Sequence, residues 1–332
     1  MMLSFFGRLG LAAVLASFVA GCGGWGGSSV ASSTGLNPAM MGPIAKMTTQ
    51  TRVGNTAASK RLLYVSNLNG PNGQGDILVY SAGLHAQNTQ PVRTITTGAN
   101  RPDGIWVDGS GVLYVVNEVN GGPNASITEF HRGQSQPFRT ITDGLVIPET
   151  VAVDANGTVY VNDRLKDTYN AQVTVYAPGS VHPQRTIPLN VSDRQSDGMA
   201  FDKNGNLFVA VNVATDALRI FKIAPGASKA VQLNIDLIGL NGPGLAIDGA
   251  NNLYVGSQSS DTVAVFAPGE TEPSHTIKKL SAYGLSAISS ASALYMPSGS
   301  FTIDEVAPGG NSPVNSITGP AGSLLRGAAL NL

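Results

Sequence analysis

Short hydrophobic and aromatic runs recur along the chain from Lys60 onward, and Gly, Asn, Asp or Pro residues end each of them. An aromatic residue marks the same point of every recurrence, at spacings of 50, 46, 48, 46 and 41 residues. The marker residues are Tyr64, Tyr114, Tyr160, Phe208, Tyr254 and Tyr295. Recurrences of this length, each with several short strand signals, are typical of the blades of a β-propeller. The pattern predicts an all-β chain with six antiparallel blades.

Each repeat contains four predicted strands, which we name A to D in chain order. Strand A has the form Gly-Ile-Trp-Val-Asp and is expected at residues 104–108, 150–154, 198–202, 244–248, 284–288 and 327–331. Strand B carries the aromatic marker residues. Strand C is expected at 77–80, 127–130, 173–176, 218–221, 263–266 and 302–306, and strand D at 93–95, 139–141, 185–187, 231–233, 275–277 and 315–317. Strand D is polar and often follows Pro, which suits an outer edge strand.

The order of the strands predicts that both ends of the chain close the ring. The first repeat begins at its strand B, whereas a spare strand A remains at residues 327–331. Pairing of this last strand with residues 62–66 would complete the first blade and leave no long exposed sheet edge. A β-sandwich is the main alternative fold, but it does not predict such a register.

The turns between strands A and B contain Asp and Gly at fixed positions, as in the DANG sequence at 154–157 and the DKNG sequence at 202–205. Asn and Gly tolerate the positive φ angles that tight hairpins require. An Asp-rich turn can also bind calcium, but these turns lack further ligands at the spacing of a calcium loop. We therefore interpret them as structural turns.

The N-terminal segment has the layout of an export signal. Arg8 precedes an apolar run at residues 9–20, which is too short to span a membrane comfortably. Residues 19–22, Val-Ala-Gly-Cys, resemble the bacterial lipoprotein box, in which cleavage before the cysteine leaves a lipidated N-terminus. A plain secretory signal and a short buried helix are the alternatives. We predict a signal peptide at 1–21, a membrane anchor at Cys22, a flexible tether at 22–59 and a propeller at 60–332, in a protein of the bacterial cell envelope.

Composition narrows the choice of partners. Charged residues make up only 12% of the chain and the formal net charge is -1, which argues against nucleic-acid binding. Cys22 is the only cysteine, so an intramolecular disulfide is excluded. We expect a monomer.

The repeats resemble NHL repeats and, more weakly, the propellers of the gluconolactonase and senescence-marker family. The resemblance extends over roughly residues 60–332 and is carried by Pro-Asp-Gly-Ile-Trp-Val-Asp at 102–108 and Gly-Val-Leu-Tyr-Val at 111–115. It implies a six-bladed propeller of four-stranded blades. The motifs are specific for this fold and not for one activity.

Candidate site residues gather at one end of the predicted blades, because the start of strand A and the end of strand B share a face in an antiparallel pair. The residues just before strand A are Asp103, Glu149, Asp197, Pro243, Tyr283 and Arg326, and those near the end of strand B are Asn67, Asn117, Asp163, Asn212, Ser257 and Ser298. Such oxygen groups suit calcium or a polyhydroxy ligand. They also suit strand caps and channel water.

From this face the sequence leads to two hypotheses about function. The first is a binding or interaction module without enzymatic activity, whose partner is an envelope protein or a small polar ligand; its ligand face consists of Asp103, Asn117, Glu149, Asp163, Asp197, Asn212 and Arg326. The second is a calcium-dependent hydrolase of lactones or related esters. Asp197-Gly-Met is similar to a gluconolactonase segment whose aspartate binds metal and acts in lactone hydrolysis, and Asp103, Glu149 and Asn117 are then candidate ligands. The chain has no clear match to that family's Glu-Gly-Pro segment or to its Asn-Gly-Leu metal ligand.

Histidine chemistry is not expected at the centre of the ring. His85, His131, His182 and His275 fall at or beyond strands C and D, on the predicted rim. This placement weakens the similarity to streptogramin lyase propellers, which rely on a histidine, and argues against a Ser-His-Asp triad. Arg326 has two open interpretations, a counter-ion in a structural network or a receptor for an anion.

Overall fold

The computed structural model describes residues 61–70, 73–82, 90–117, 124–213, 217–235, 237, 244–257, 260–278, 293–298 and 301–331, without the side chains of 193–197 and 298. All of these residues belong to a compact unit that extends from Thr56 to Leu332. The predicted signal peptide, lipidation site and tether lie outside the described residues, as do His85, Pro243, Tyr283 and the strand predicted at 284–288. No helix in the described ranges is long and apolar enough to cross a membrane.

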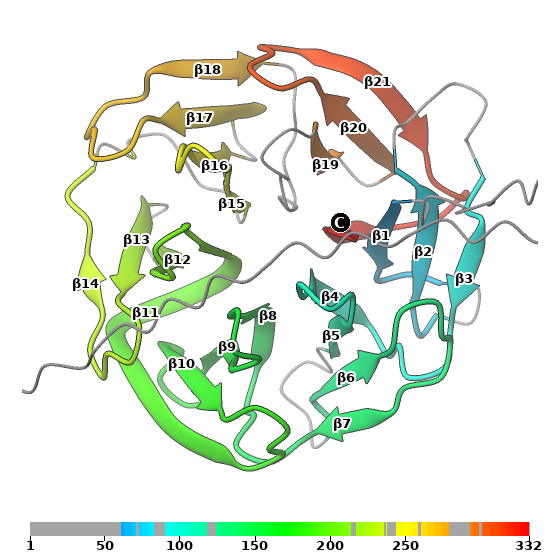
Figure 1. Cartoon of the computed structure of the whole chain (residues 1–332), viewed down its shortest axis with the longest axis horizontal. Coiled ribbons are helices and arrows are strands. Elements are labelled where there is room, and N and C mark those ends of the chain that lie inside the picture. The colour runs from blue at the N-terminus through cyan, green and yellow to red at the C-terminus, as the bar shows by residue number, and fades with distance from the viewer. Residues whose placement is uncertain are drawn as a thin grey trace, which may run out of the picture. The chain divides into compact units, whose positions relative to one another are not determined.

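The strands form a ring of antiparallel blades, which confirms the prediction of an all-β six-bladed propeller (Figure 1). Blade 1 contains β22 (Leu325–Asn331), β1 (Leu62–Asn67), β2 (Asp76–Ser81) and β3 (Arg93–Ile95), and blade 2 contains β4 (Pro102–Val107), β5 (Leu113–Asn117), β6 (Ser126–Phe130) and β7 (Arg139–Ile141). Blade 3 contains β8 (Pro148–Val153), β9 (Val159–Arg164), β10 (Asn170–Tyr176) and the first part of β11 (Pro183–Phe201). Blade 4 contains the second part of β11, then β12 (Leu207–Val213), β13 (Ala217–Ile223) and β14 (Val231–Gln232). Blade 5 contains β15 (Leu245–Ile247), β16 (Leu253–Ser257), β17 (Thr262–Phe266) and β18 (His275–Lys278), and blade 6 contains β19 (Leu294–Ser298), β20 (Thr302–Val306) and β21 (Pro313–Thr318).

The two ends of the propeller meet in blade 1, as the order of the repeats predicts. Strand β22 pairs antiparallel with β1, with Leu62 opposite Asn331 and Tyr64 opposite Ala329. The amide of Asn67 strengthens this closure, because its Oδ1 accepts a hydrogen bond of 2.9 Å from the backbone N–H of Leu324. A single blade therefore joins the first and last strands of the ring.

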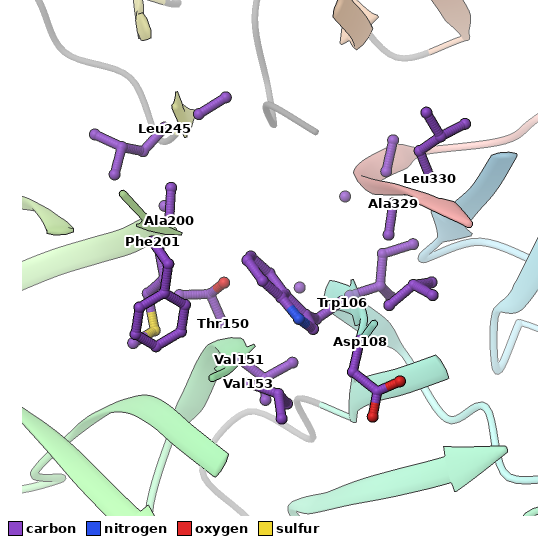
Figure 2. A pocket seen from close by; sticks show the side chains of 18 of the residues that line it. Trp106, Asp108, Thr150, Val151, Val153, Ala200, Phe201, Leu245, Ala329 and Leu330 are labelled. Carbon is purple, nitrogen blue, oxygen red and sulfur yellow. The ribbon is translucent and has the colours of Figure 1, made fainter. Parts of the chain in front are cut away.

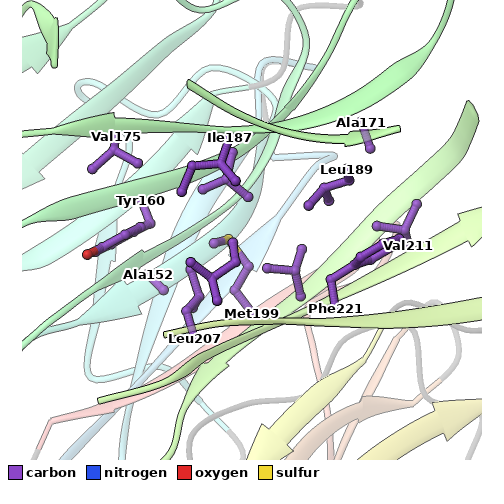
Figure 3. Packing of buried hydrophobic residues seen from close by; sticks show 13 residues of the cluster. Ala152, Tyr160, Ala171, Val175, Ile187, Leu189, Met199, Leu207, Val211 and Phe221 are labelled. Carbon is purple, nitrogen blue, oxygen red and sulfur yellow. The ribbon is translucent and has the colours of Figure 1, made fainter. Parts of the chain in front are cut away.

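The blades are held together by apolar side chains between neighbouring sheets. Figure 3 shows the cluster between blades 3 and 4, where Tyr160 and Ile187 of blade 3 pack with Met199, Leu207 and Val211 of blade 4. Fully burying an aliphatic or aromatic side chain contributes about 1.5–3 kcal/mol to stability. The recurring hydrophobic residues are therefore the core between blades.

In blades 2 to 5, the turn between the first two strands is held by one aspartate. The carboxylate of Asp154 accepts backbone N–H bonds of 2.9 Å from Asn156 and Thr158, and Asp108, Asp202 and Asp248 make the same pair of bonds in their own blades. The phenol of Tyr254 donates a bond of 3.1 Å to Asp248, and burial raises the pKa of Tyr254 to about 12. The interpretation of these motifs as structural turns is confirmed.

A glycine at the start of the innermost strand allows neighbouring blades to approach closely. A Cβ atom on Gly104 would lie 2.6 Å from the carbonyl oxygen of Glu149 and 2.6 Å from Cα of Thr150. A Cβ atom on Gly327 would likewise lie 2.9 Å from the carbonyl oxygen of Asp103. These distances are shorter than van der Waals contact, so the absence of a side chain at Gly104 and Gly327 sets the spacing of the blades around the axis.

Candidate functional site

The innermost strands surround a cavity of about 350 Å³, which we call the channel cavity (Figure 2). It is lined by residues of β4, β8, β11, β15 and β22, one strand from each of blades 1 to 5. Much of the wall is apolar and includes Trp106, Val151, Met199, Phe201, Leu245, Ala329 and Leu330. The sequence pattern predicts Trp106 only as a packing residue of strand A. Its indole in fact meets the ring of Phe201 edge to face, with centroids 6.1 Å apart, and both rings line the cavity.

Three of the predicted site residues line the same cavity. Asp103, Glu149 and Arg326 are each the second residue of an innermost strand, in β4, β8 and β22. Because these strands occupy equivalent places in their blades, the three residues lie toward one end of the cavity, which we call its polar end. The prediction that these residues precede the strands is wrong, because each of them lies within its strand. The strands begin earlier because Pro102 pairs with Asn117 and Pro148 pairs with Asp163 across an irregular register.

Glu149 is held by Arg164, which is not among the site residues predicted from the sequence. The carboxylate is buried, and its Oε1 lies 2.7 Å from Nη2 of Arg164 at the end of β9. The guanidinium of Arg164 also lies over the ring of Tyr169, 5.7 Å from the ring centroid, and 52% of Tyr169 is exposed. The ion pair fixes the orientation of Glu149 beside the cavity. The only sequence signal for this role is that Arg164 follows Asp163 at the end of the strand.

The amide of Asn117 bonds to β6 of its own blade and to the loop that leads into β4. Its Nδ2 donates to the backbone oxygen of Gly98 at 3.1 Å and to the hydroxyls of Ser126 and Thr128 at 3.2 Å. Its Oδ1 accepts a bond of 2.8 Å from the backbone N–H of Asn100. The side chain is 1% exposed and does not line the channel cavity.

Asp163 caps the loop that leads into β8. Its carboxylate accepts a bond of 2.6 Å from the backbone N–H of Ile147 and bonds of 3.1 Å from that of Val146. The side chain is fully buried, and this burial raises its pKa to about 6 despite the backbone bonds, which favour the charged form. Asp163 therefore positions the strand that carries Glu149.

The raised pKa of Asp163 predicts a dependence of stability on pH. The folded state binds this proton more tightly than the unfolded state, so the stabilisation is complete below about pH 4, is lost as the pH rises through about 6 and amounts to roughly 3 kcal/mol. In the wild type, the free energy of unfolding should therefore include a decline between about pH 4 and pH 6 that comes from Asp163. We expect the Asp163→Asn variant to lack this contribution when the free energy of unfolding is measured by urea denaturation across that range. The exposed Asp167→Asn is the matched control on the same blade. The prediction would be contradicted if the free energy of unfolding changed with pH equally in wild type and Asp163→Asn.

Of the remaining residues predicted for the ligand face, Asn212 is not among those that line the channel cavity. Asn212, at the end of β12, is partly buried and opposite Gln195, while the side chain of Asp197 lies outside the described residues. Among the side chains that the structure describes, no three His, Cys, Asp or Glu residues lie close enough together to hold a metal ion. The proposed calcium ligand set includes Asp197 and so stays a prediction.

The described histidines lie on the outside of the ring. His131 stacks on Phe138, with centroids 3.9 Å apart, and Nδ1 of His182 lies 2.9 Å from the carboxylate of Asp143. His275 begins the outer strand β18 and is exposed. None of the three lines the channel cavity.

Comparison with known proteins identifies the fold and no family. No protein-family model matches the sequence, and no curated protein matches it. The structure is similar to a chain of the nidogen/laminin complex, with a TM-score of 0.59 and 16% identity over 82% of this chain and 98% of that one. It is similar to Kuenenia stuttgartiensis hydrazine synthase, with a TM-score of 0.55 and 16% identity over 71% of this chain and 76% of that one. It is also similar to streptogramin B lyase, with a TM-score of 0.50 and 13% identity over 67% and 70% of the two chains. At these identities the similarity extends to the propeller fold alone, and the resemblance to NHL repeats and gluconolactonases stays a prediction.

Proposed function

We propose that this chain is a lipoprotein of the bacterial cell envelope, anchored through Cys22, whose propeller is a binding module rather than an enzyme. The observation that carries the binding proposal is the channel cavity, which combines the rings of Trp106 and Phe201 with the ionic groups of Asp103, Glu149 and Arg326. The anchor rests on the sequence of residues 1–22. A tether at 22–59 would let the propeller reach ligands away from the membrane surface.

The size and charge of the cavity favour a small ligand without strong net charge. A volume of about 350 Å³ is within the range of small-molecule sites, about 300–1,000 Å³. Among the described side chains at the polar end, the carboxylates of Asp103 and Glu149 are balanced by the guanidinium groups of Arg326 and Arg164. A ligand whose polar part is a neutral hydroxyl or amide group, or a zwitterion, would therefore bind there with the lowest electrostatic cost. The apolar part of such a ligand would lie against Trp106.

The alternative, a calcium-dependent hydrolase, is less well supported by the contacts of its ligand set. The amide of Asn117 bonds to the loop that leads into β4, and the carboxylate of Glu149 is paired with Arg164. Recruiting either one to a metal would break those bonds. The similar chains come from a nidogen/laminin complex as well as from proteins named for enzymes, so the shared fold leaves the choice to the site.

Binding in the channel cavity can be followed through its own tryptophan. The chain has two tryptophans, so the Trp25→Phe variant leaves Trp106 as the only indole. We expect the neutral probe N-phenyl-naphthylamine to quench Trp106 and to emit by energy transfer from it in the detergent-solubilised full chain. Filling the cavity by Ala246→Leu should weaken binding of the probe, as followed by this energy transfer, about tenfold or more, since the probe then lacks space. The matched control Val231→Leu changes an exposed residue of the outer edge and should leave it unchanged.

The same preparation separates the binding module from the alternatives. No energy transfer, or transfer that Ala246→Leu leaves intact, would exclude this cavity as the binding site. Calcium at 100 times its dissociation constant would add about 2.7 kcal/mol of stability if it bound only the folded form. Such a shift together with lactone hydrolysis would favour the hydrolase.

For the anchor, wild type should fractionate with membranes and the Cys22→Ser variant should not.

A further inference from the structure

Blade 4 departs from the other blades at its outer edge. Its outer strand, β14, contains only Val231 and Gln232, whereas β18 of blade 5 contains four residues. The Arg-Thr-Ile sequence of several other outer strands is replaced by Val-Gln-Leu, and Leu233 follows the strand rather than ending it. The corresponding isoleucines of blades 1 and 2, Ile95 and Ile141, are fully buried, but Leu233 is only partly buried.

A second cavity, of about 390 Å³, lies where this edge meets blade 5, and we call it the blade 4–5 cavity. Its wall is mainly apolar and includes Phe208, Leu233, Ile235, Ile247, Leu253 and Phe266. It lies beside the shortened outer strand, where Leu233 and Ile235 are only partly buried. It is distinct from the channel cavity, with which it shares only Ile247 among the described residues.

Among the described residues, Lys222 is the one cation that lines this apolar space. Lys222 lies opposite Phe208 in the register of β12 and β13, and its Nζ lies 5.7 Å from the centroid of the Phe208 ring. The residues opposite the aromatic marker in the other blades are Val79, Glu129, Val175, Val265 and Glu305. A lysine at this position therefore occurs in blade 4 alone among the six.

The acidic groups that the structure describes near Lys222 do not neutralise it. Among the described residues no carboxylate lies within ion-pair distance of Lys222. Asp202 also lines the cavity, but it accepts bonds from the backbone N–H groups of Asn204 and Asn206 and a bond of 2.7 Å from the amide of Asn206. Glu270 lines the cavity too and is exposed. The ammonium group therefore remains the group best placed to meet an anion.

We propose that the blade 4–5 cavity binds a small amphiphile with one anionic head group and an apolar body. The head group would pair with Lys222, and the body would displace water from the wall formed by Phe208, Leu233 and Phe266. A cation beside an aromatic ring in a largely apolar site gains more from an anion than an exposed lysine does, because water screens the pair less. The site is independent of the ligand proposed for the channel cavity.

A matched pair of fluorescent probes tests this assignment in the full chain. Anilinonaphthalene sulfonate is anionic, and N-phenyl-naphthylamine has a similar apolar body without the charge. Lys222→Met keeps an unbranched apolar side chain but removes the ammonium group, and it should weaken binding of the anionic probe about tenfold, the loss expected for a charged contact of about 1.4 kcal/mol. Binding of the neutral probe should not change.

Two further variants attribute the effect to this cavity. Lys229→Met removes the same charge from an exposed position of blade 4 outside the cavity and should leave both probes unaffected. Leu233→Phe fills the cavity and should weaken binding of the anionic probe about as much as Lys222→Met does. The proposal is overturned if Lys222→Met binds the anionic probe as wild type does, if Lys229→Met loses as much affinity, or if Leu233→Phe has no effect. The channel variant Ala246→Leu should not alter the Lys222-dependent binding, so failure at one cavity is distinguishable from failure at the other.

Discussion

Replacing Gly104 with valine is expected to lower the free energy of unfolding by about 3 kcal/mol, the upper end of the range for an overpacked core. The new Cβ would lie 2.6 Å from backbone atoms of blade 3, and backbone held in a sheet cannot rotate away as a flexible side chain can. Gly104→Ala should have a smaller effect of the same sign. Urea denaturation of the purified chain measures both.

Gly109→Ala is the matched control for Gly104. It lies in the turn that follows β4, and a Cβ atom placed there meets nothing within 4 Å. This control should therefore change stability by less than about 0.5 kcal/mol. If Gly104→Ala were as stable as Gly109→Ala, the spacing between blades 2 and 3 would not depend on the missing side chain. Because Asp103 precedes Gly104, loss of probe binding in the channel cavity should accompany the loss of stability.

The fold was predictable because its signals are local. Asp, Gly and Pro mark the turns in the sequence of the repeats, and the aromatic marker of strand B recurs at a nearly constant spacing. The closing strand followed from the order of these signals, and Tyr64 opposite Ala329 confirms it. The continuity of β11 was not predictable, because the segment that joins blades 3 and 4 becomes a strand only through partners on β10 and β12.

The site was less predictable, because position along a strand does not determine the direction in which a side chain points. Asp103 and Asn117 were assigned to one face by the same reasoning, yet only Asp103 lines the channel cavity. The register irregularity between Pro102 and Ile105 is set by contacts between strands and has no sequence signature. Lys222 was missed for a related reason, since its importance depends on a cavity beside the shortened β14.

Replacing Arg139 with methionine is expected to lower the free energy of unfolding by about 3–5 kcal/mol at neutral pH, because it breaks a buried ion pair. Its Nη2 and Nε lie 2.7 and 2.8 Å from the two carboxylate oxygens of Glu129, which is fully buried. Without the guanidinium, a buried carboxylate is left without its cation. Guanidinium denaturation of wild type and variant at pH 7 measures the loss.

The cause can be separated from lost packing by pH and by a second substitution. Burial raises the pKa of Glu129, and Arg139 opposes this, so the pKa rises further in Arg139→Met. A raised folded-state pKa means that stability is retained below the unfolded pKa of about 4.3 and is lost as the pH rises. The defect of Arg139→Met should therefore be small near pH 4 and complete at pH 7. Adding Glu129→Val, which copies Val175 at the equivalent position of blade 3, should restore most of the stability at pH 7. A defect that is independent of pH, and that Glu129→Val does not relieve, would assign the role of Arg139 to packing alone.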